Sequence, residues 1–347
     1  MQAITLRAGL ERKSLPSMAC AAVKLQARAL AHPLLTRGWL QLLNSHGALR
    51  ELAHLQPRLL HKIYRPYLSS RLDRPQRLAA LASHYRFVLQ HGLADTVAHA
   101  VRGPLVLASF EGKSGAAYQV DLRAIVPMER EGELVLQLRC GATLVYSVAF
   151  SFLADGSQSS AASVGVGCLQ GPQCGAGLEL ARAATRDLHG LRPKQLLLRL
   201  VQQLGYAYGC SQVLLVGNDN RAVLKQIRKG RVHADYNAFW LEMGAQRRAD
   251  GDYALACGPL QAPLLDEIAS KKRSEARKRH ELLAGVADAV VENFAQRGAP
   301  IPRERGRIAA RAPASEPASV LATELAIELV TTPGGCNAIG YLPTSGT

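Results

Sequence analysis

The hydrophobic pattern of this chain changes its period twice, and this feature most constrains the fold. Up to Pro104 apolar residues recur at helical spacing, whereas residues 105–169 hold short apolar runs separated by turn residues. The helical period returns after Gly171. We therefore expect an α+β fold, with a helical N-terminal part and a central antiparallel β meander flanked by helices. The expected strands are residues 105–110, 118–126, 134–138, 143–152 and 161–169.

Residues that typically begin or end helices and strands predict the bounds of individual segments. Asp73 and Pro75 predict the start of a helix over residues 74–92, because aspartate caps helices and proline fits their first turn. Helices are also expected at 178–188, from Pro193 to near Gly205 or Gly209, and over most of 264–295. Residues 213–216 and 253–256 predict two further strands.

The domain organisation follows the same changes in pattern. We expect a basic helical extension at residues 1–59, an α+β domain at 60–296, and a disordered tail at 297–347, which is rich in Ala, Pro, Arg and Ser. Seven cysteines without regular spacing indicate neither a disulfide framework nor a metal site. The N-terminus lacks the pattern of a signal peptide, and no apolar run is long enough to cross a membrane. We expect a cytoplasmic protein and leave attachment to the inner-membrane surface open.

The charge is strongly positive and unevenly distributed. The formal net charge is +15, and residues 1–100 carry 14 Lys and Arg against 4 Asp and Glu. This balance predicts an anionic partner, namely an acidic lipid surface, nucleic acid or a phosphorylated ligand; the alternative is an ordinary solvated surface. The absence of RNP, zinc-finger and Walker signatures counts against specific nucleic-acid recognition. A second basic cluster comprises Lys271, Lys272, Arg273, Arg277, Lys278 and Arg279.

The densest group of reactive side chains opens the helix at Pro193. His189 is a candidate general base, while Arg192 and Lys194 are candidate ligands for phosphate or carboxylate. The structural alternative is that His189 and Arg192 hydrogen-bond the turn between two helices. As a unit, the three residues favour a function.

A glycine-rich strand end precedes this group. Gly165, Gly167 and Gly171 let the backbone approach a ligand, with Gln170 and Asn218 as neighbouring polar candidates.

Asp235 and Tyr236 are candidate catalytic residues on a later helix. Asp235 either orients a ligand amine or caps that helix. Trp240 is expected in the core. Cys168 is also expected there, since the sequence shows no base beside it.

Several of these stretches together resemble the VirK/YbjX family of Gram-negative bacteria. The resemblance covers about residues 60–296, departs at 254–259, and implies links to virulence, envelope integrity and resistance to cationic antimicrobial peptides, without an established enzymatic activity. The matching motifs are Ser83-His84-Tyr85, Glu131-Gly132-Glu133-Leu134, Gly167 to Pro172, Glu179, Arg182 and Thr185, His189 to Lys194, Asp235 to Trp240, and the basic cluster at 271–279.

The order of expected elements also resembles the GNAT acyltransferase layout. In that layout a strand feeds a glycine-rich turn, whose backbone N–H groups hold a pyrophosphate at a helix N-terminus. Here residues 164–168 correspond to that strand, and 172–177 separate it from the expected helix. The resemblance implies an acyl-CoA cofactor and an acyltransferase-like enzyme. The alternative is a non-catalytic basic protein that binds anionic lipid or nucleic acid.

Overall fold

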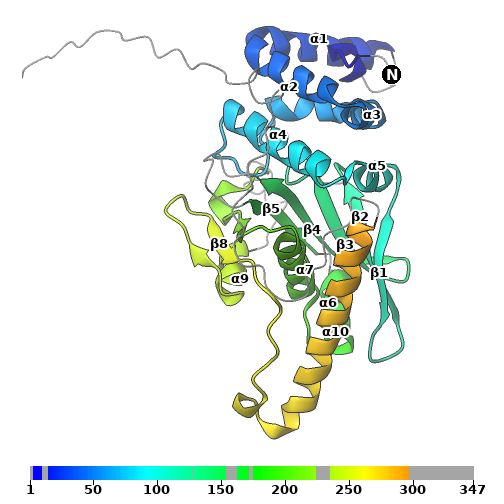
Figure 1. The fold of residues 1–347 in the computed structure, drawn as a ribbon, viewed down its shortest axis with the longest axis vertical. Helices are drawn as coiled ribbons and strands as arrows, with labels where there is room; N and C mark the ends of the chain where they lie inside the picture. The colour runs from blue at the N-terminus through cyan, green and yellow to red at the C-terminus, as the bar shows by residue number, and fades with distance from the viewer. Residues whose placement is uncertain are drawn as a thin grey trace, which may run out of the picture. The chain divides into compact units, whose positions relative to one another are not determined.

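A computed structural model describes residues 3–9, 15–126, 128–153, 162–171, 175–223 and 235–296, drawn as a ribbon in Figure 1. The chain divides into the units Met1–Ile301 and Pro302–Thr347, and every described residue belongs to the first. The expected tail at 297–347 lies outside the described residues.

The N-terminal third is helical, as the sequence predicts. The predicted helix at 74–92 is confirmed, and the Asp73 carboxylate accepts a hydrogen bond from the Gln76 backbone at 2.8 Å while the Gln76 side chain accepts from Asp73 N. The elements are the 3₁₀ helix η1 (Leu6–Gly9), α1 (Leu15–Ala31), α2 (Pro33–Ser45), α3 (Gly47–Leu55), the 3₁₀ helix η2 (Pro57–Tyr64), α4 (Arg74–Gln90) and α5 (Ala94–Arg102).

One eight-stranded sheet organises the rest of the chain. Its spatial order is β1-β2-β3-β4-β5-β6-β8-β7, in which β1 to β5 form the predicted antiparallel meander and β5 pairs with β6 in parallel. The α+β prediction is therefore confirmed. The strands are β1 (Leu105–Glu111), β2 (Ala117–Ala124), β3 (Leu134–Cys140), β4 (Thr143–Leu153), β5 (Ser163–Gln170), β6 (Gln212–Leu215), β7 (Gln246–Arg247) and β8 (Tyr253–Ala256).

Helices connect the later strands. The link between the parallel strands β5 and β6 contains α6 and α7, and α7 packs on β4, β5 and β6. The last helix, α10, packs on α7 and β1, and Figure 1 shows α7 and α10 over the same side of the sheet. These elements are α6 (Gly175–Asp187), α7 (Pro193–Ala207), the 3₁₀ helix η3 (Asn218–Asn220), α9 (Tyr236–Glu242), the 3₁₀ helix η4 (Leu265–Glu267) and α10 (Ser270–Ala295).

The hydrophobic core continues from the N-terminal helices into the sheet. It includes Trp39 on α2, Phe152 on β4 and Phe294 on α10, and the Trp39 and Tyr85 rings lie 6.1 Å apart. Alternate strand residues point to the other face of the sheet. There a smaller apolar cluster forms, comprising Met128, Val135, Ala149 and Cys168. The division of the chain at residue 59 stays a prediction.

The parallel pair β5 and β6 ends before β5 does. The ladder stops at Val166 and Leu215, with a last hydrogen bond of 3.1 Å from Val216 N to Val166 O. Beyond this point β5 continues to Gln170 and, among the described strands, pairs only with β4. No described strand therefore neighbours the outer edge of β5 from Gly167 onward. In open sheets, ligands bind at such carboxyl ends of parallel strands.

Candidate functional site

The side chain of Tyr236, the first residue of α9, closes the free edge of β5. Its hydroxyl donates to Leu169 O at 2.8 Å and accepts from Leu169 N at 2.9 Å. The phenol thus takes both backbone groups that a neighbouring strand would otherwise take. Tyr236 is only 3% exposed, which places its hydroxyl inside the molecule.

Three more reactive groups surround this hydroxyl, and together with Tyr236 we call them the Tyr236 cluster. The Arg221 guanidinium donates to the hydroxyl at 3.0 Å, and its central carbon lies 4.0 Å from the centre of the Tyr236 ring. The Cys168 sulfur lies 3.4 Å from the same hydroxyl and is hydrogen-bonded to the Glu131 carboxyl. All four residues are buried, namely Glu131, Cys168, Arg221 and Tyr236.

Burial tunes the protonation of the cluster. It raises the pKa of the Glu131 carboxyl, against the opposing effects of the Cys168 hydrogen bond and the Arg221 charge. It also raises the pKa of the Cys168 thiol, and the Glu131 charge adds to this effect. The pKa of Tyr236 is raised chiefly by burial and then by Cys168. A neutral thiol is a poor nucleophile, which leaves the carboxyl and the phenol as the candidate groups for proton transfer in the cluster.

Glycine lets the segment that carries Glu131 lie directly against the sheet. A Cβ atom at Gly132 would come within 2.5 Å of Phe150 N, and one at Gly167 would overlap the Glu131 carbonyl. Any side chain at either position would push Glu131 away from Cys168.

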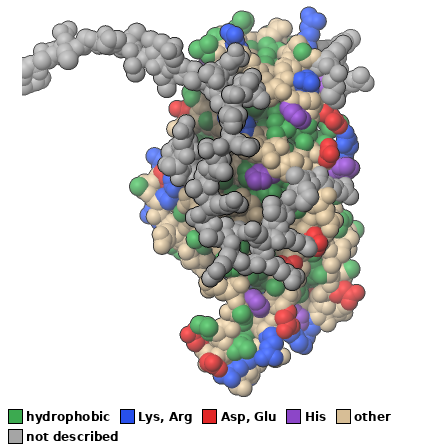
Figure 2. Space-filling view, viewed as in Figure 1, with side chains coloured by type: hydrophobic (Ala, Val, Ile, Leu, Met, Phe, Trp, Pro, Cys, Tyr) green, Lys and Arg blue, Asp and Glu red, His purple; other side chains and the backbone are tan. Residues whose placement is uncertain are grey.

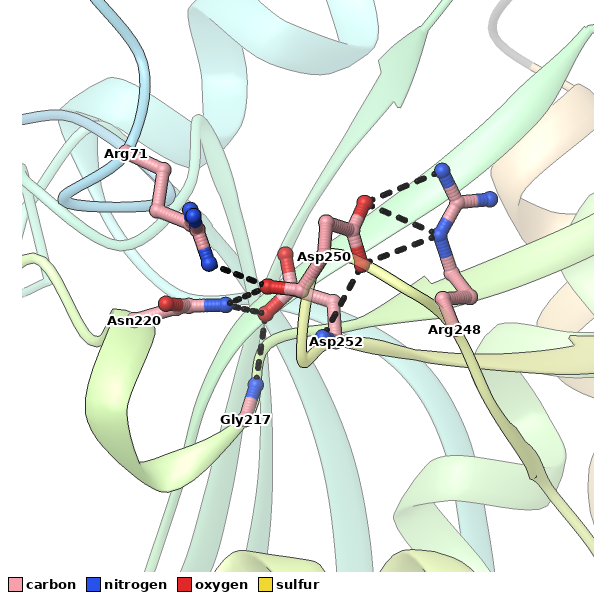
Figure 3. A network of polar contacts seen from close by, with 6 residues as sticks. All are labelled: Arg71, Gly217, Asn220, Arg248, Asp250 and Asp252. Atoms are coloured by element: carbon pink, nitrogen blue, oxygen red, sulfur yellow. Dashed lines mark hydrogen bonds and ion pairs between the residues drawn. The ribbon is translucent and has the colours of Figure 1, made fainter. Parts of the chain in front are cut away.

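A polar network behind the cluster fixes the loop that carries Arg221 (Figure 3). The Asp252 carboxylate accepts from Gly217 N and from the Asn220 amide, both at 2.8 Å. The Arg71 side chain donates to Asp250 O at 2.7 Å, so three distant segments meet at one turn. The loop is held from its other side as well, because Ser70 N donates to Asn220 O at 2.6 Å.

The predicted residues Asn218, Asp235 and Tyr236 are brought together at the start of α9. The Asn218 side-chain oxygen accepts from Tyr236 N at 2.8 Å, and its amide nitrogen donates to the Asp235 carboxylate at 2.8 Å. Asp235 also accepts from Ala238 N, which makes it the cap of α9. The Asn218 hydrogen bond is the main cause that lowers the pKa of Asp235.

Arg192 and Lys194 lie at the start of α7 and face α9. Arg192 forms an ion pair with Glu242, and the Lys194 ammonium lies 4.2 Å from the centre of the Phe239 ring. Burial, and then the Arg192 charge, lower the pKa of Lys194. Both cations therefore border the helix that carries Tyr236.

His189 lies in the preceding turn and has a positive φ of 53°. Within the described part of the chain, no hydrogen bond or ion pair joins it to the Tyr236 cluster. It lies near Asp187, which accepts a hydrogen bond from Ser114 N at 2.6 Å.

The basic cluster at 271–279 occupies the first half of α10. Lys271, Lys272, Arg277 and Lys278 are exposed, while the Arg273 side chain donates to Ile268 O at 2.9 Å. The Arg279 side chain lies against Gly190, so this cluster reaches the His189 turn.

The predicted ligand-binding glycines are closely packed by protein. Gly165 faces the Leu68 and Leu153 side chains, and Gly171 faces the Tyr146 ring. Gln170 is half-buried at the end of β5. The intervening residues 172–174 lie outside the described chain.

A second buried polar group lies between α4, η2 and β4, and we call it the Lys62 cluster. The Lys62 ammonium donates to one Glu133 carboxylate oxygen at 2.5 Å, and the Tyr85 hydroxyl donates to the other. Nearby, the Tyr67 and Ser151 hydroxyls are 2.7 Å apart, and His84 Nδ1 accepts from Phe152 N at 3.2 Å. The members are Lys62, Tyr67, His84, Tyr85, Glu133 and Ser151, all nearly inaccessible to solvent.

The sequence assigned no role to Glu131 and Arg221 and placed Cys168 only in the core. Cys168 is buried as expected, but it has an acid beside it. The available signal was the pair of glutamates around Gly132, which interrupts an apolar run directly before β3. Arg221 had no comparable signal, because it is one of many arginines.

In the described residues no group of three or more His, Cys, Asp or Glu side chains is placed to hold a metal ion. None of the helices with described residues has the length and apolar character needed to span a bilayer.

Comparison with known proteins places most of the chain in one family. A family model described as "Protein of unknown function (DUF535)" matches residues 17–292. The uncharacterized protein YbjX of Escherichia coli is 30% identical over 275 residues, which cover 78% of this chain and 82% of the relative. An uncharacterized protein of Haemophilus influenzae is 26% identical over 73% of this chain and 82% of its own length. No solved structure matches.

Proposed function

We propose that this chain, which belongs to the DUF535 family as its resemblance to VirK/YbjX proteins predicts, is an acyltransferase-like enzyme acting at the Tyr236 cluster. One observation carries the proposal. A buried carboxyl, phenol and guanidinium meet at the carboxyl end of a parallel strand pair, beside a strand edge that no described strand covers. Clusters of buried titratable groups with shifted pKa values gather at functional sites, which makes this cluster the candidate for catalysis.

The start of α6 and the start of α7 are the candidate sites for the phosphate-bearing part of acyl-CoA. Helix α6 begins at Gly175, three residues earlier than the sequence suggested, so fewer residues separate it from Gly171 along the chain. Backbone N–H groups at a helix N-terminus favour a pyrophosphate, as the GNAT-like layout implies. Arg192 and Lys194 at the start of α7 supply further positive charge.

The side chains of the Tyr236 cluster each take one role in the proton transfers that accompany acyl transfer. Bound acyl-CoA supplies a thioester carbonyl that an amine or hydroxyl can attack. The Glu131 carboxylate takes the proton of the attacking group, which its raised pKa suits. The Tyr236 phenol turns its proton from Leu169 O to the sulfur that leaves when the carbon–sulfur bond breaks, and the proton held by Glu131 afterwards returns to the phenolate. Arg221 stabilises the resulting phenolate from the face of the ring.

The decisive experiment measures CoA release from a series of acyl-CoAs by chromatography, since seven cysteines would react with thiol reagents. Glu131→Gln and Tyr236→Phe are expected to lower the rate by about 10²-fold or more. Glu129→Gln is the matched control, because Glu129 lies two residues away and pairs with Arg58 and Arg65 at the surface. Arg192→Ala and Lys194→Ala are expected to weaken acyl-CoA binding.

A chain that neither releases CoA nor melts at a higher temperature with any acyl-CoA would contradict the proposal. Turnover unchanged in both Glu131→Gln and Tyr236→Phe would move the chemistry away from the Tyr236 cluster.

We also propose that the acyl acceptor is an envelope component, which would connect the activity to virulence, envelope integrity and peptide resistance. The support is the VirK/YbjX resemblance alone. The second candidate is a non-catalytic basic protein that binds an anionic surface. The four exposed cations at the start of α10 favour this candidate.

A further inference from the structure

A groove opens between the first helices, far along the sequence from the Tyr236 cluster. Its volume is about 650 Å³, within the range of roughly 300–1,000 Å³ that small-molecule sites occupy. Its wall is mainly apolar. The apolar lining residues are Leu6 from η1, Ala29 and Leu30 from α1, and Pro33 and Leu40 from α2.

Two polar side chains that line the groove, Thr36 and Asn44, are already bonded within the protein. The Asn44 side chain accepts from Ile4 N at 2.7 Å and donates to Ile4 O at 2.9 Å. The Thr36 hydroxyl is bonded to His32 O and to the Tyr64 hydroxyl, both at 2.7 Å. The Thr36 and Asn44 side chains are therefore occupied within the protein, and the other polar lining residues are the exposed Gln26, Arg37 and Gln41. An aliphatic chain suits the apolar part of the wall best.

Large apolar side chains stand exposed around the groove. Leu30 is 82% exposed, Leu34 is 78% exposed and Val23 is 64% exposed. Val23 and Leu30 share one stripe of α1, because residues seven apart lie on the same side of a helix. A group of exposed leucines at the mouth of an apolar groove marks an interaction site.

The charge around the groove has a single sign. Residues 15–50 contain no Asp or Glu, whereas Lys24, Arg28, Arg37 and Arg50 lie on α1 to α3. Arg37 lines the groove itself. Figure 2 shows hydrophobic and Lys or Arg side chains together at the top of the view, where Figure 1 places α1 and α2. Exposed apolar side chains among unopposed cations complement an anionic lipid surface, since helices of this composition lie in the bilayer interface.

We propose that η1, α1 and α2 dock on the surface of an anionic lipid bilayer and that the groove takes an acyl chain of one lipid. Leu30 and Leu34 enter the interface beside the groove, and Arg28 and Arg37 face the phosphates. This docking site does not depend on acyl transfer at the Tyr236 cluster.

The test is flotation of the full chain with vesicles of phosphatidylglycerol and phosphatidylcholine. The wild type is expected to float with these vesicles and less well in about 0.5 M salt, where the Debye length falls to about 4 Å. Leu30→Glu and Leu34→Glu are each expected to lower the bound fraction about tenfold or more, because each removes an apolar side chain from the interface and adds repulsion. Leu264→Glu is the matched control, since Leu264 is 67% exposed and lies before η4.

A second measurement tests the groove. Lysophosphatidylglycerol below its micellar concentration is expected to raise the melting temperature of the wild type but not of Leu30→Glu, while glycerophosphoglycerol, the same headgroup without a chain, is expected to have no effect. Equal shifts with both probes would overturn the acyl-chain site. Vesicle binding that is unchanged in Leu30→Glu but lost in Lys271→Gln/Lys272→Gln would assign docking to α10 instead. A wild-type dimer that Leu30→Glu dissociates would show that a second copy covers the groove.

Discussion

Glu131 and Glu133 are two residues apart and both buried, yet the structure places them in different surroundings. Each oxygen of the Glu133 carboxylate has a strong donor, one from the Lys62 ammonium and one from the Tyr85 hydroxyl. Glu131 has a weakly polar thiol as a hydrogen-bond partner, and burial raises its pKa. The Glu133 carboxylate is thus compensated by two buried donors, whereas burial disfavours the charged form of Glu131 and makes it the candidate for proton exchange.

The largest expected effect is the stability lost when the Glu133 carboxylate loses its Lys62 partner. Lys62→Met leaves the Glu133 carboxylate buried without its cation, which is expected to cost about 3–5 kcal/mol of unfolding free energy. Denaturant titration at neutral pH measures this loss. Arg65→Met is the control, because Arg65 pairs with Glu129 at the surface and should cost about 1 kcal/mol or less.

The double variant Lys62→Met/Glu133→Leu is expected to regain most of the stability lost in Lys62→Met. If it stays as unstable as the single variant, the packing of the lysine stem matters more than the ion pair.

The next effect concerns pH. Burial, with Lys62 in the same direction and Glu133 opposing, lowers the pKa of His84 to about 4. Between about pH 6.5 and 4, His84 is protonated in the unfolded chain but neutral in the folded chain. The unfolding free energy therefore falls as the pH drops through this window. The expected loss is about 3 kcal/mol, at about 1.4 kcal/mol for each pH unit.

His84→Gln is expected to remove this part of the pH dependence in chemical denaturation series. His99→Gln should leave it in place, since His99 is exposed on α5. A slope identical in wild type and His84→Gln would mean that His84 is protonated equally in both states.

The smallest of the three effects is the stability lost when a member of the Tyr236 cluster is changed. Tyr236→Phe removes the hydroxyl that serves Leu169 N and O, and an unpaired buried backbone group costs about 1–3 kcal/mol. Differential scanning calorimetry measures the loss against Tyr206→Phe, whose ring is 41% exposed. An unchanged melting temperature in Tyr236→Phe would mean that water replaces the hydroxyl and that the edge of β5 is accessible to solvent.

Much of the fold could be predicted from local pattern. The strands of the meander follow from short apolar runs between glycine and charged turn residues, and α4 follows from Asp73 and Pro75. The start of α6 was placed too late, because Gly175 and Gly177 have low helix propensity and resemble a turn. The two-residue strand β7 is too short to show any period.

The candidate site was predictable only in part. Tyr236 and Asn218 were named because they follow a strand end or open a helix, both of which are local features. The partners Glu131 and Arg221 come from segments about 100 residues apart along the chain, and no local pattern reports such a contact. The burial of Lys62 was equally hidden, since lysine is almost never fully buried unless paired.

The way in which Tyr236 closes β5 has a consequence for how the chain folds. The hydroxyl that covers Leu169 lies 67 residues later in the sequence, so the outer edge of β5 stays bare until α9 arrives. A bare strand edge is a template for pairing with another chain. Nascent or partly unfolded chains can therefore associate edge to edge through residues 167–170. Once α9 is in place, Tyr236 blocks this association.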